Sequence, residues 1–316
     1  MLSYSNIIAF AAAVETEGPY WLLSIFHLNT RIFSRSRGQS STAAAAYRSS
    51  SIIKDQKQGK TFDYSKKKGT VYSTILTPAD VPAWANDRAM LWNAIELTEK
   101  HCKAQVCREI EVSLPCNLSV DQNIELVTNY IQGTFVATNM IADVSIHEKT
   151  TDDSNAVEGN YYHAHILLTL REVSSTGFGK KNREWNSKKQ HQKWREKWQE
   201  YANNALALAK CDERIDHRTL DAQKMEALLH RDFIKAKELD RKPEPKIGVA
   251  ALALHRKGIP STRHQAWVNI RKFNMRKSLG QLKRRLTSKK APSQLLQERL
   301  TSLRKSKKRT GHTNER

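Results

Sequence analysis

The sequence predicts an α+β fold with a central sheet, helices packed on it and a basic tail at the end. Runs with an apolar residue at every second position, which indicate strands, alternate along the chain with runs that have the period of helices. The charge is the third observation: of the formal net charge of +21, residues 255–316 contribute +17, with 19 Lys and Arg against two acidic residues. We therefore expect an extension over residues 1–21, a globular domain over 22–242, and a linker with a basic tail over 243–316, helical at first and then disordered.

The expected strands and helices are separate segments along the chain. Strands are expected over residues 21–28, 105–114, 142–147 and 160–170, with a loop or hairpin over the lysine-rich residues 54–68. Helices are expected over residues 80–101, 119–135, 182–210 and 221–240, and a basic amphipathic helix over 266–287. Ser119, with Gln122 three positions later, has the pattern of a capping box. Pro243 and Pro245 then form a stiff linker.

Two of the strands carry histidines. In residues 160–170 the alternation places His163 and His165 on one face and the apolar residues on the other. His147 ends the preceding strand, residues 142–147. The polar residues between the two strands predict the turn of a hairpin, which would place His147 near His163 and His165. Three neutral imidazoles that leave coordination positions open are typical of a catalytic metal site. The alternative is that these histidines are hydrogen-bonded residues of an ordinary sheet.

A tyrosine near the N-terminal end of the globular domain is the second candidate. After Gly38, a cluster of Ser and Thr offers N-cap oxygens, and the alanines at 43–46 favour a short helix that carries Tyr47. Small neighbours let a bulky partner approach the phenol, and Arg35, Arg37 and Arg48 are near enough in sequence to hold phosphates. The alternative is a core tyrosine on an alanine-rich helix.

Together these residues predict phosphoryl chemistry. A bound cation can stabilise the charge that builds on a phosphate oxygen, and a phenol can attack phosphorus and form a phosphodiester with the protein. The pKa of a phenol is ordinarily near 10, so the tyrosine needs help from the cation or from a base, for which Glu109 and Glu111 are candidates on one face of the 105–114 strand.

The charge and the cysteines limit the class of protein. A polycationic tail is expected to bind nucleic acid or an anionic membrane surface, the alternative being a solvated extension without a specific partner. No run of about 18 apolar residues is present, so we expect no membrane insertion, and no secretory signal is recognisable. The four cysteines are spaced too widely for a Cys-x-x-Cys motif, and we expect reduced thiols in a cytoplasmic protein.

Five motifs in order give the chain a resemblance to a known family. They are SRSRGQSSTAAAAYR at 34–48, LWNAIE at 91–96, REIEVSLP at 108–115, HAH at 163–165 and IDHRTL at 215–220. Together they resemble the MobA/MobL family of plasmid mobilisation relaxases, which belong to the endonuclease superfamily named for its histidine-hydrophobe-histidine motif. The resemblance covers about residues 22–225. Asn160-Tyr161-Tyr162 stands where the family commonly has Asn-Pro, a change at the entry of the strand that spares the histidines.

The resemblance implies a sheet of about five antiparallel strands with helices packed on it. It places the nucleophile on Tyr47 and a divalent cation, Mg²⁺ or Mn²⁺, on His147, His163 and His165. Family members cut one strand of transfer-origin DNA, remain linked to its 5′ phosphate through the tyrosine and later rejoin the ends. The resemblance further implies single-stranded or supercoiled origin DNA, accessory mobilisation proteins and a type IV secretion coupling protein as partners. Arg218 in the last motif is a further candidate for DNA binding.

Two alternatives keep part of this interpretation. The first is a rolling-circle replication initiator of the same superfamily, in which the tyrosine follows the histidine pair and has a lysine four residues on. The downstream tyrosine here, Tyr201, has Ala205 at that position, which argues against it. The second is a catalytically inactive basic protein that binds DNA.

The tail makes a testable prediction about DNA binding. Deletion of residues 255–316 should flatten the salt dependence of DNA affinity, because each phosphate that the protein no longer neutralises reduces the slope of log K against log[salt] by about 0.7 to 0.9. Fluorescence anisotropy at several salt concentrations measures the slope. The matched control keeps the tail at full length but has every Lys and Arg in residues 255–316 changed to Gln. This variant should behave like the deletion. An unchanged slope in both would assign the phosphate contacts to the globular domain.

Overall fold

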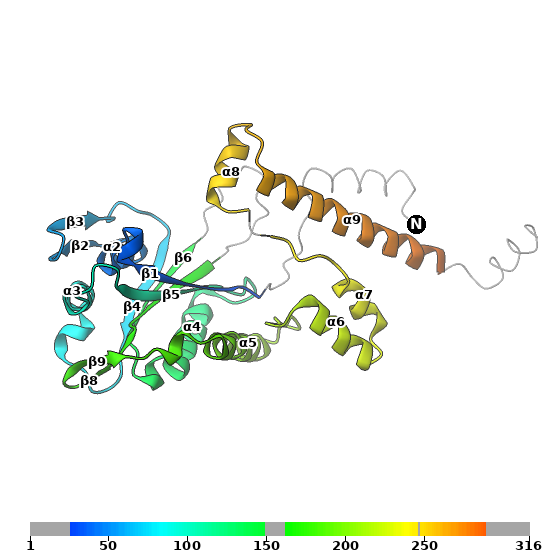
Figure 1. Ribbon diagram of the computed structural model, residues 1–316. Helices are drawn as coiled ribbons and strands as arrows, with labels where there is room; N and C mark the ends of the chain where they lie inside the picture. Colours follow the sequence, from blue (N-terminus) through cyan, green and yellow to red (C-terminus); the bar gives the residue numbers. More distant parts are fainter. Residues whose placement is uncertain (1–25, 149–161, 246, 289–316) are drawn as a thin grey trace, which may run out of the picture. The chain divides into compact units, whose positions relative to one another are not determined.

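The chain divides into two compact units, with the boundary along the sequence between His217 and Arg218 (Figure 1). The structure, a computed structural model, describes residues 26–148, 162–245 and 247–288. The first unit is an α+β domain and the second is helical. This confirms the predicted fold class, while the predicted domain boundaries at residues 21 and 242 stay predictions.

The first unit is built on a five-stranded sheet in the order β1-β5-β7-β6-β4, in which all neighbours are antiparallel. Its strands are β1 (Leu28–Ser34), β4 (Thr70–Leu76), β5 (Gln105–Ser113), β6 (Ala142–Glu148) and β7 (Tyr162–Leu168). Three strands match the prediction closely. The first one differs, because β1 begins at Leu28, where the predicted strand ends, and β4 was not predicted.

Helices and short hairpins surround the sheet. The helices of the first unit are α2 (Ser41–Ser49), α3 (Arg88–Thr98), α4 (Val120–Thr134) and α5 (Lys188–Leu208). The hairpins are β2 (Ile52–Asp55) with β3 (Lys60–Asp63), and β8 (Arg171–Ser174) with β9 (Gly177–Lys181). Short 3-10 turns are η1 (Arg35–Arg37), η2 (Ala83–Asn86), η3 (Val136–Thr138) and η4 (Glu184–Asn186). The capping box of Ser119 and Gln122 is present at the start of α4.

The two faces of the sheet pack against different helices. On one face, apolar residues of β5, β6 and β7 pack with Tyr130 of α4 and with Trp194 and Trp198 of α5. On the other face, Trp92 of α3 and the buried alanines of α2 form a second cluster. Because side chains alternate along a strand, the apolar residues of β6 and β7 that face α4 and α5 leave the histidines on the side of α2 and α3.

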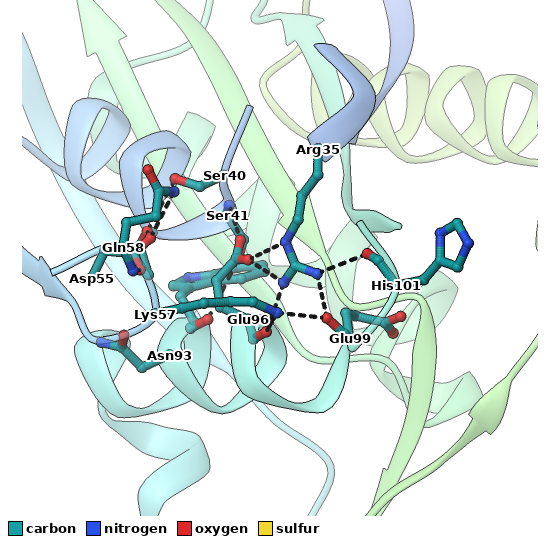
Figure 2. Close-up of polar contacts among 12 residues, drawn as sticks. Arg35, Ser40, Ser41, Asp55, Lys57, Gln58, Asn93, Glu96, Glu99 and His101 are labelled. Atoms are coloured by element: carbon teal, nitrogen blue, oxygen red, sulfur yellow. Dashed lines mark hydrogen bonds and ion pairs between the residues drawn. The ribbon is translucent and has the colours of Figure 1, made fainter. Parts of the chain in front are cut away.

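A buried carboxylate fixes helix α2 against helix α3 (Figure 2). Glu96 of α3 accepts hydrogen bonds from both the backbone N–H and the hydroxyl of Ser41, at 2.7 Å each, and from the guanidinium of Arg35. An anion at the first turn complements the exposed N–H groups and the dipole of α2. Gly38 turns the chain into this arrangement with a φ of 67°, and Ser40 caps the helix. The start of the helix that carries Tyr47 is therefore held in place.

The second unit contains four helices within the residues that the structure describes. They are α6 (Leu220–Leu229), α7 (Phe233–Leu239), α8 (Val249–Arg256) and α9 (Thr262–Ser288). The single helix expected over 221–240 is two helices, because Arg231 adopts a φ of 57° and Asp232 caps a new one. Inside this unit Asp240 pairs with Lys224 and Lys277.

Helix α9 agrees with the basic helix expected over 266–287. The disorder expected at the end of the tail concerns residues 289–316, which lie outside the described residues, as does the extension expected over 1–21. Within the described part of the chain, no helix has the length and apolar character needed to cross a membrane.

The close packing of α2 on α3 predicts sensitivity to side-chain size. Ala45 is fully buried in the apolar cluster that α2 shares with α3, and a leucine there adds three carbon atoms to a buried position. Ala45→Leu should therefore lower the free energy of unfolding by about 1–3 kcal/mol. Urea denaturation measures the loss. Ala43→Leu, on the half-buried side of the same helix, is the matched control and should cost less; equal losses would contradict the packing described here.

Candidate functional site

Three imidazoles converge on one face of the sheet. His147 on β6 lies directly opposite His163 on β7, and His165 lies two residues further along β7. Their ring centroids are 4.8–5.4 Å apart, and one ligand nitrogen from each falls within 4.8 Å of the others. His147 and His165 are buried, and His163 is half-buried. We call these three residues the histidine trio. The pairing of β6 with β7 brings together the same three histidines that the sequence analysis grouped.

The buried carboxylate of Glu109 orients one member of the trio. It accepts a 2.8 Å hydrogen bond from Nδ1 of His165, which leaves Nε2 of that ring with the lone pair that a metal needs. Burial favours the neutral carboxyl, but the hydrogen bonds from His165 and Arg48 and the charge of Arg48 prevail and hold the pKa of Glu109 far below its usual range. Arg31 also pairs with this carboxylate. Glu109 is thus a fixed anion behind the trio.

His147 is kept neutral and is tied to the tyrosine helix. Its Nε2 lies 2.6 Å from the backbone carbonyl of Arg48, and since a carbonyl only accepts, Nε2 carries the hydrogen and Nδ1 the lone pair. Burial, opposed by this hydrogen bond and supported by neighbouring positive charge, lowers the pKa of His147 to about 4. A neutral imidazole is the form that binds a metal.

The donor set therefore fits a divalent cation. Nitrogen ligands on two adjacent strands, one neutral ring and one ring held by a carboxylate are the features of a ligated histidine cluster. By ligand type alone, imidazoles suit the softer divalent metals better than Mg²⁺.

Tyr47 lies beside the trio and reaches the surface. It is in the last turn of α2, and the residue is 46% exposed, so it is not the core tyrosine of the alternative interpretation. Arg48, the next residue, makes the carbonyl contact with His147. The phenol ring packs edge-on against Tyr64 at 5.2 Å between centroids.

Two of the three arginines near Tyr47 pair with buried carboxylates of the protein itself. Arg35 is bound to Glu96 and to backbone carbonyls near the end of α3, and Arg48 is buried against Glu109. Arg37 is exposed at the end of its turn. Arg218 belongs to the second unit, where it pairs with Glu226. The structure thus leaves Arg37 and Arg218 at the surface and gives Arg35 and Arg48 internal partners.

Glu111 and His217 also have protein partners. Glu111 lies opposite His165 across β5 and β7, and Nε2 of His27 is 3.7 Å from its carboxylate. His217 donates from Nδ1 to the side-chain oxygen of Gln199 at 2.6 Å. His217 is therefore part of a local hydrogen-bonded network.

Sequence reasoning missed Lys67. Its ammonium lies 4.9 Å from the centroid of the Tyr47 ring and 3.5 Å from Nε2 of His147. Residues 54–68 were expected to be a polar loop or hairpin, and a hairpin is what they form, but nothing in the order of residues indicates that one of its several lysines reaches the trio. Burial and the charge of Arg48 lower the pKa of Lys67.

The alternative nucleophile is placed elsewhere. Tyr201 of α5 packs with Tyr130 in the cluster on the opposite face of the sheet from the trio. A Cβ added to Gly133 of α4 would come within 2.0 Å of the Tyr201 hydroxyl, so this half-buried side chain lies directly against α4. The position of Tyr201 does not support the rolling-circle alternative.

Fold and site together define an α+β protein in which a candidate metal centre adjoins a candidate nucleophile. The model of the MobA/MobL family matches residues 39–257, well over half of the chain. The chain belongs to the MobA/MobL family.

Relatives and a solved structure agree with this membership. The protein named "Conjugal transfer protein TraA" of Rhizobium radiobacter is 31% identical over 255 residues, 70% of this chain and 22% of that protein. "Mobilization protein MobL" of Acidithiobacillus ferridurans is 34% identical over 232 residues, 65% of this chain and 60% of that protein. The chain thus spans about a fifth of the first and three fifths of the second. A solved chain described under "Molecular Basis of Vancomycin Resistance Transfer in Staphylococcus aureus" has a TM-score of 0.55 and 32% identity, covering 62% of this chain and 99% of that one.

Glu109 gives a prediction about metal affinity. Glu109→Gln should weaken binding of Mn²⁺ by about 10–100-fold, because an amide holds the His165 ring less firmly than a carboxylate does. Isothermal titration calorimetry measures the affinity. Glu96→Gln is the matched control, since it also removes a buried charge with an arginine partner but does not contact the trio. Equal affinities of both variants and the unaltered protein would argue against the orienting role.

Proposed function

We propose that this chain is a conjugative relaxase that nicks one strand of transfer-origin DNA and stays linked to it through Tyr47. The observation that carries the proposal is the hydrogen bond from His147 to the carbonyl of Arg48. Because Arg48 directly follows Tyr47, this bond joins the end of the helix that bears an exposed phenol to the histidine trio. A DNA strand on that surface can meet both.

In the proposed reaction, Oη of Tyr47 attacks the phosphorus of one phosphodiester. The new Oη–P bond forms as the P–O3′ bond breaks, so the 5′ phosphate stays on the tyrosine and a 3′ end is released. The phenol proton passes to solvent, to which Tyr47 is open, and the released O3′ takes up a proton from water. The phosphotyrosyl ester keeps the energy of the cleaved bond, so attack by a 3′ hydroxyl reseals the strand without ATP.

The residues around Tyr47 have separate roles in this proposal. The trio holds a divalent cation, which when bound supplies a Lewis acid for a phosphate oxygen. Glu109 orients His165 and neutralises Arg48; its lowered pKa makes it a weak base, so we assign it a positioning role. Glu111 stays a candidate base beside His165.

Membership of the family supports the proposed cation and partners. Mg²⁺ or Mn²⁺ is proposed for the trio on family grounds, although imidazoles alone favour a softer metal. The proposed substrate is single-stranded or supercoiled origin DNA, and Arg37, Arg218 and the basic tail are proposed to contact its backbone. We place the nicking activity in residues 22–242. Accessory mobilisation proteins and a type IV secretion coupling protein are the proposed partners, in keeping with relatives named for conjugal transfer and mobilisation.

Tyr47 makes the decisive prediction for this function. With Mg²⁺ or Mn²⁺, the protein should nick a supercoiled plasmid that carries the DNA flanking its own gene and should form a covalent adduct with labelled single-stranded DNA. Tyr47→Phe should abolish the adduct, because the attacking oxygen is gone. Denaturing gel electrophoresis detects it. Tyr201→Phe should form the adduct normally; the reverse pattern would favour the rolling-circle alternative, and no adduct with the unaltered protein would leave only a DNA-binding protein.

A further inference from the structure

Lys67 is placed between the two parts of the site that the proposed reaction needs. Its ammonium is 4.9 Å from the centroid of the Tyr47 ring and 3.5 Å from Nε2 of His147. That nitrogen already donates to the carbonyl of Arg48 at 2.6 Å, so it has no lone pair to offer the lysine. The ammonium therefore faces the space between phenol and trio with its hydrogen-bond donors unused by His147.

A hydrogen-bonded turn positions Lys67 between the phenol and the trio. The backbone N–H of Lys67 donates to the carbonyl of Tyr64 at 2.9 Å, and Asp63 at the end of β3 accepts from both the N–H and the hydroxyl of Ser65. Tyr64 in turn donates from its N–H to the carbonyl of Ser51, just beyond α2, and its ring lies edge-on to Tyr47. The turn is thus attached to the end of the helix that bears the phenol.

Within the described part of the chain, the charge of Lys67 has no carboxylate to balance it. Arg31 and Arg48 share Glu109, and Arg35 has Glu96, but among the residues that the structure describes no carboxylate pairs with Lys67. Its other charged neighbour, Arg48, has the same sign. A half-buried cation without a counter-charge is costly, and an anion that enters this space removes the cost. The ligand chemistry that fits is the phosphate group of a DNA backbone.

We propose that Lys67 is a catalytic residue that donates a hydrogen bond to a non-bridging oxygen of the phosphate attacked by Tyr47. The proposal rests on the relaxase function above. As the Oη–P bond forms and the P–O3′ bond breaks, negative charge moves from the phenol oxygen across the phosphoryl group to O3′, and the fixed ammonium stabilises it. Lys67 keeps its proton throughout. It takes the role that the sequence suggested for the arginines near Tyr47.

The test compares Lys67→Met with Lys67→Arg and with Lys68→Met. Lys67→Met removes the charge and keeps most of the length of the side chain, and Lys67→Arg keeps a cation. Lys68, the next residue in the sequence, is exposed. Lys68→Met is therefore the matched control for the loss of one positive charge. Adduct formation is followed in a single turnover with saturating labelled single-stranded origin DNA and Mn²⁺, and DNA affinity is measured separately by anisotropy without metal.

Lys67→Met should slow adduct formation by about 100-fold or more, as loss of a preorganised donor to a transition-state oxygen does, and should weaken DNA binding by less than about tenfold. Lys67→Arg should retain at least a tenth of the rate, and Lys68→Met should match the unaltered protein. A DNA substrate with sulfur in place of the contacted phosphate oxygen should slow adduct formation by the unaltered protein. The same substitution should add little to the slow rate of Lys67→Met, because the hydrogen bond is already absent. If Lys67 were only structural, the sulfur would slow both proteins equally.

The outcomes separate this inference from the proposed function. If the unaltered protein forms the adduct, Tyr47→Phe does not, and Lys67→Met reacts at the normal rate, the relaxase function stands and the role of Lys67 is wrong. If Lys67→Met loses DNA affinity by more than tenfold but keeps the normal rate at saturating DNA, Lys67 contributes binding and not catalysis, which also overturns the inference. If Tyr47→Phe still forms the adduct, or the unaltered protein forms none, the proposed function fails first and the role of Lys67 fails with it.

Discussion

The buried carboxylate of Glu109 is the interaction on which the site depends. From the middle of β5 it binds Arg31 of β1, Arg48 of α2 and His165 of β7, so one side chain connects three elements that are far apart in the sequence. A buried anion is costly without partners, and breaking such a group by removing one member leaves the rest uncompensated. The network is therefore coupled: the strand that carries two of the imidazoles and the helix that carries the phenol are positioned through the same anion.

The two faces of the sheet differ in composition and in the role that their residues have. The face covered by α4 and α5 is packed with tryptophans and large aliphatic residues, whereas the face of α2 and α3 combines Trp92 and other apolar residues with alanines and buried polar groups. Since alternate residues of β6 and β7 point to opposite faces, each strand contributes to the apolar core and to the trio at once. Changes on the apolar face are expected to act through stability, and changes on the other face through both stability and chemistry.

The sequence was informative where local patterns decide the structure. Alternation in residues 142–147 and 160–170 was enough to place three histidines on one face. The capping box at Ser119 could be predicted from the spacing of Ser119 and Gln122 alone. β4 was missed because its residues are half-buried at an edge of the sheet and show no clean alternation, and the break at Arg231 was missed because a non-glycine residue makes it. The partners of Arg35, Arg48 and Lys67 lie far along the chain, as Glu96 does from Arg35, and composition and spacing do not specify such pairs.

Helix α2 is only nine residues long and is fastened at both ends, by Glu96 at its start and by the hydrogen bond between His147 and the Arg48 carbonyl at its finish. A segment anchored in this way has little freedom to swing its tyrosine toward an incoming strand. In the proposed reaction, the adjustment needed for in-line attack would then fall on the nucleic acid, which would have to unstack and bend its backbone over a stationary phenol. Under that proposal, sequences that distort easily at that step would be favoured as cleavage sites, and the flexibility of the DNA itself would contribute to the choice of target.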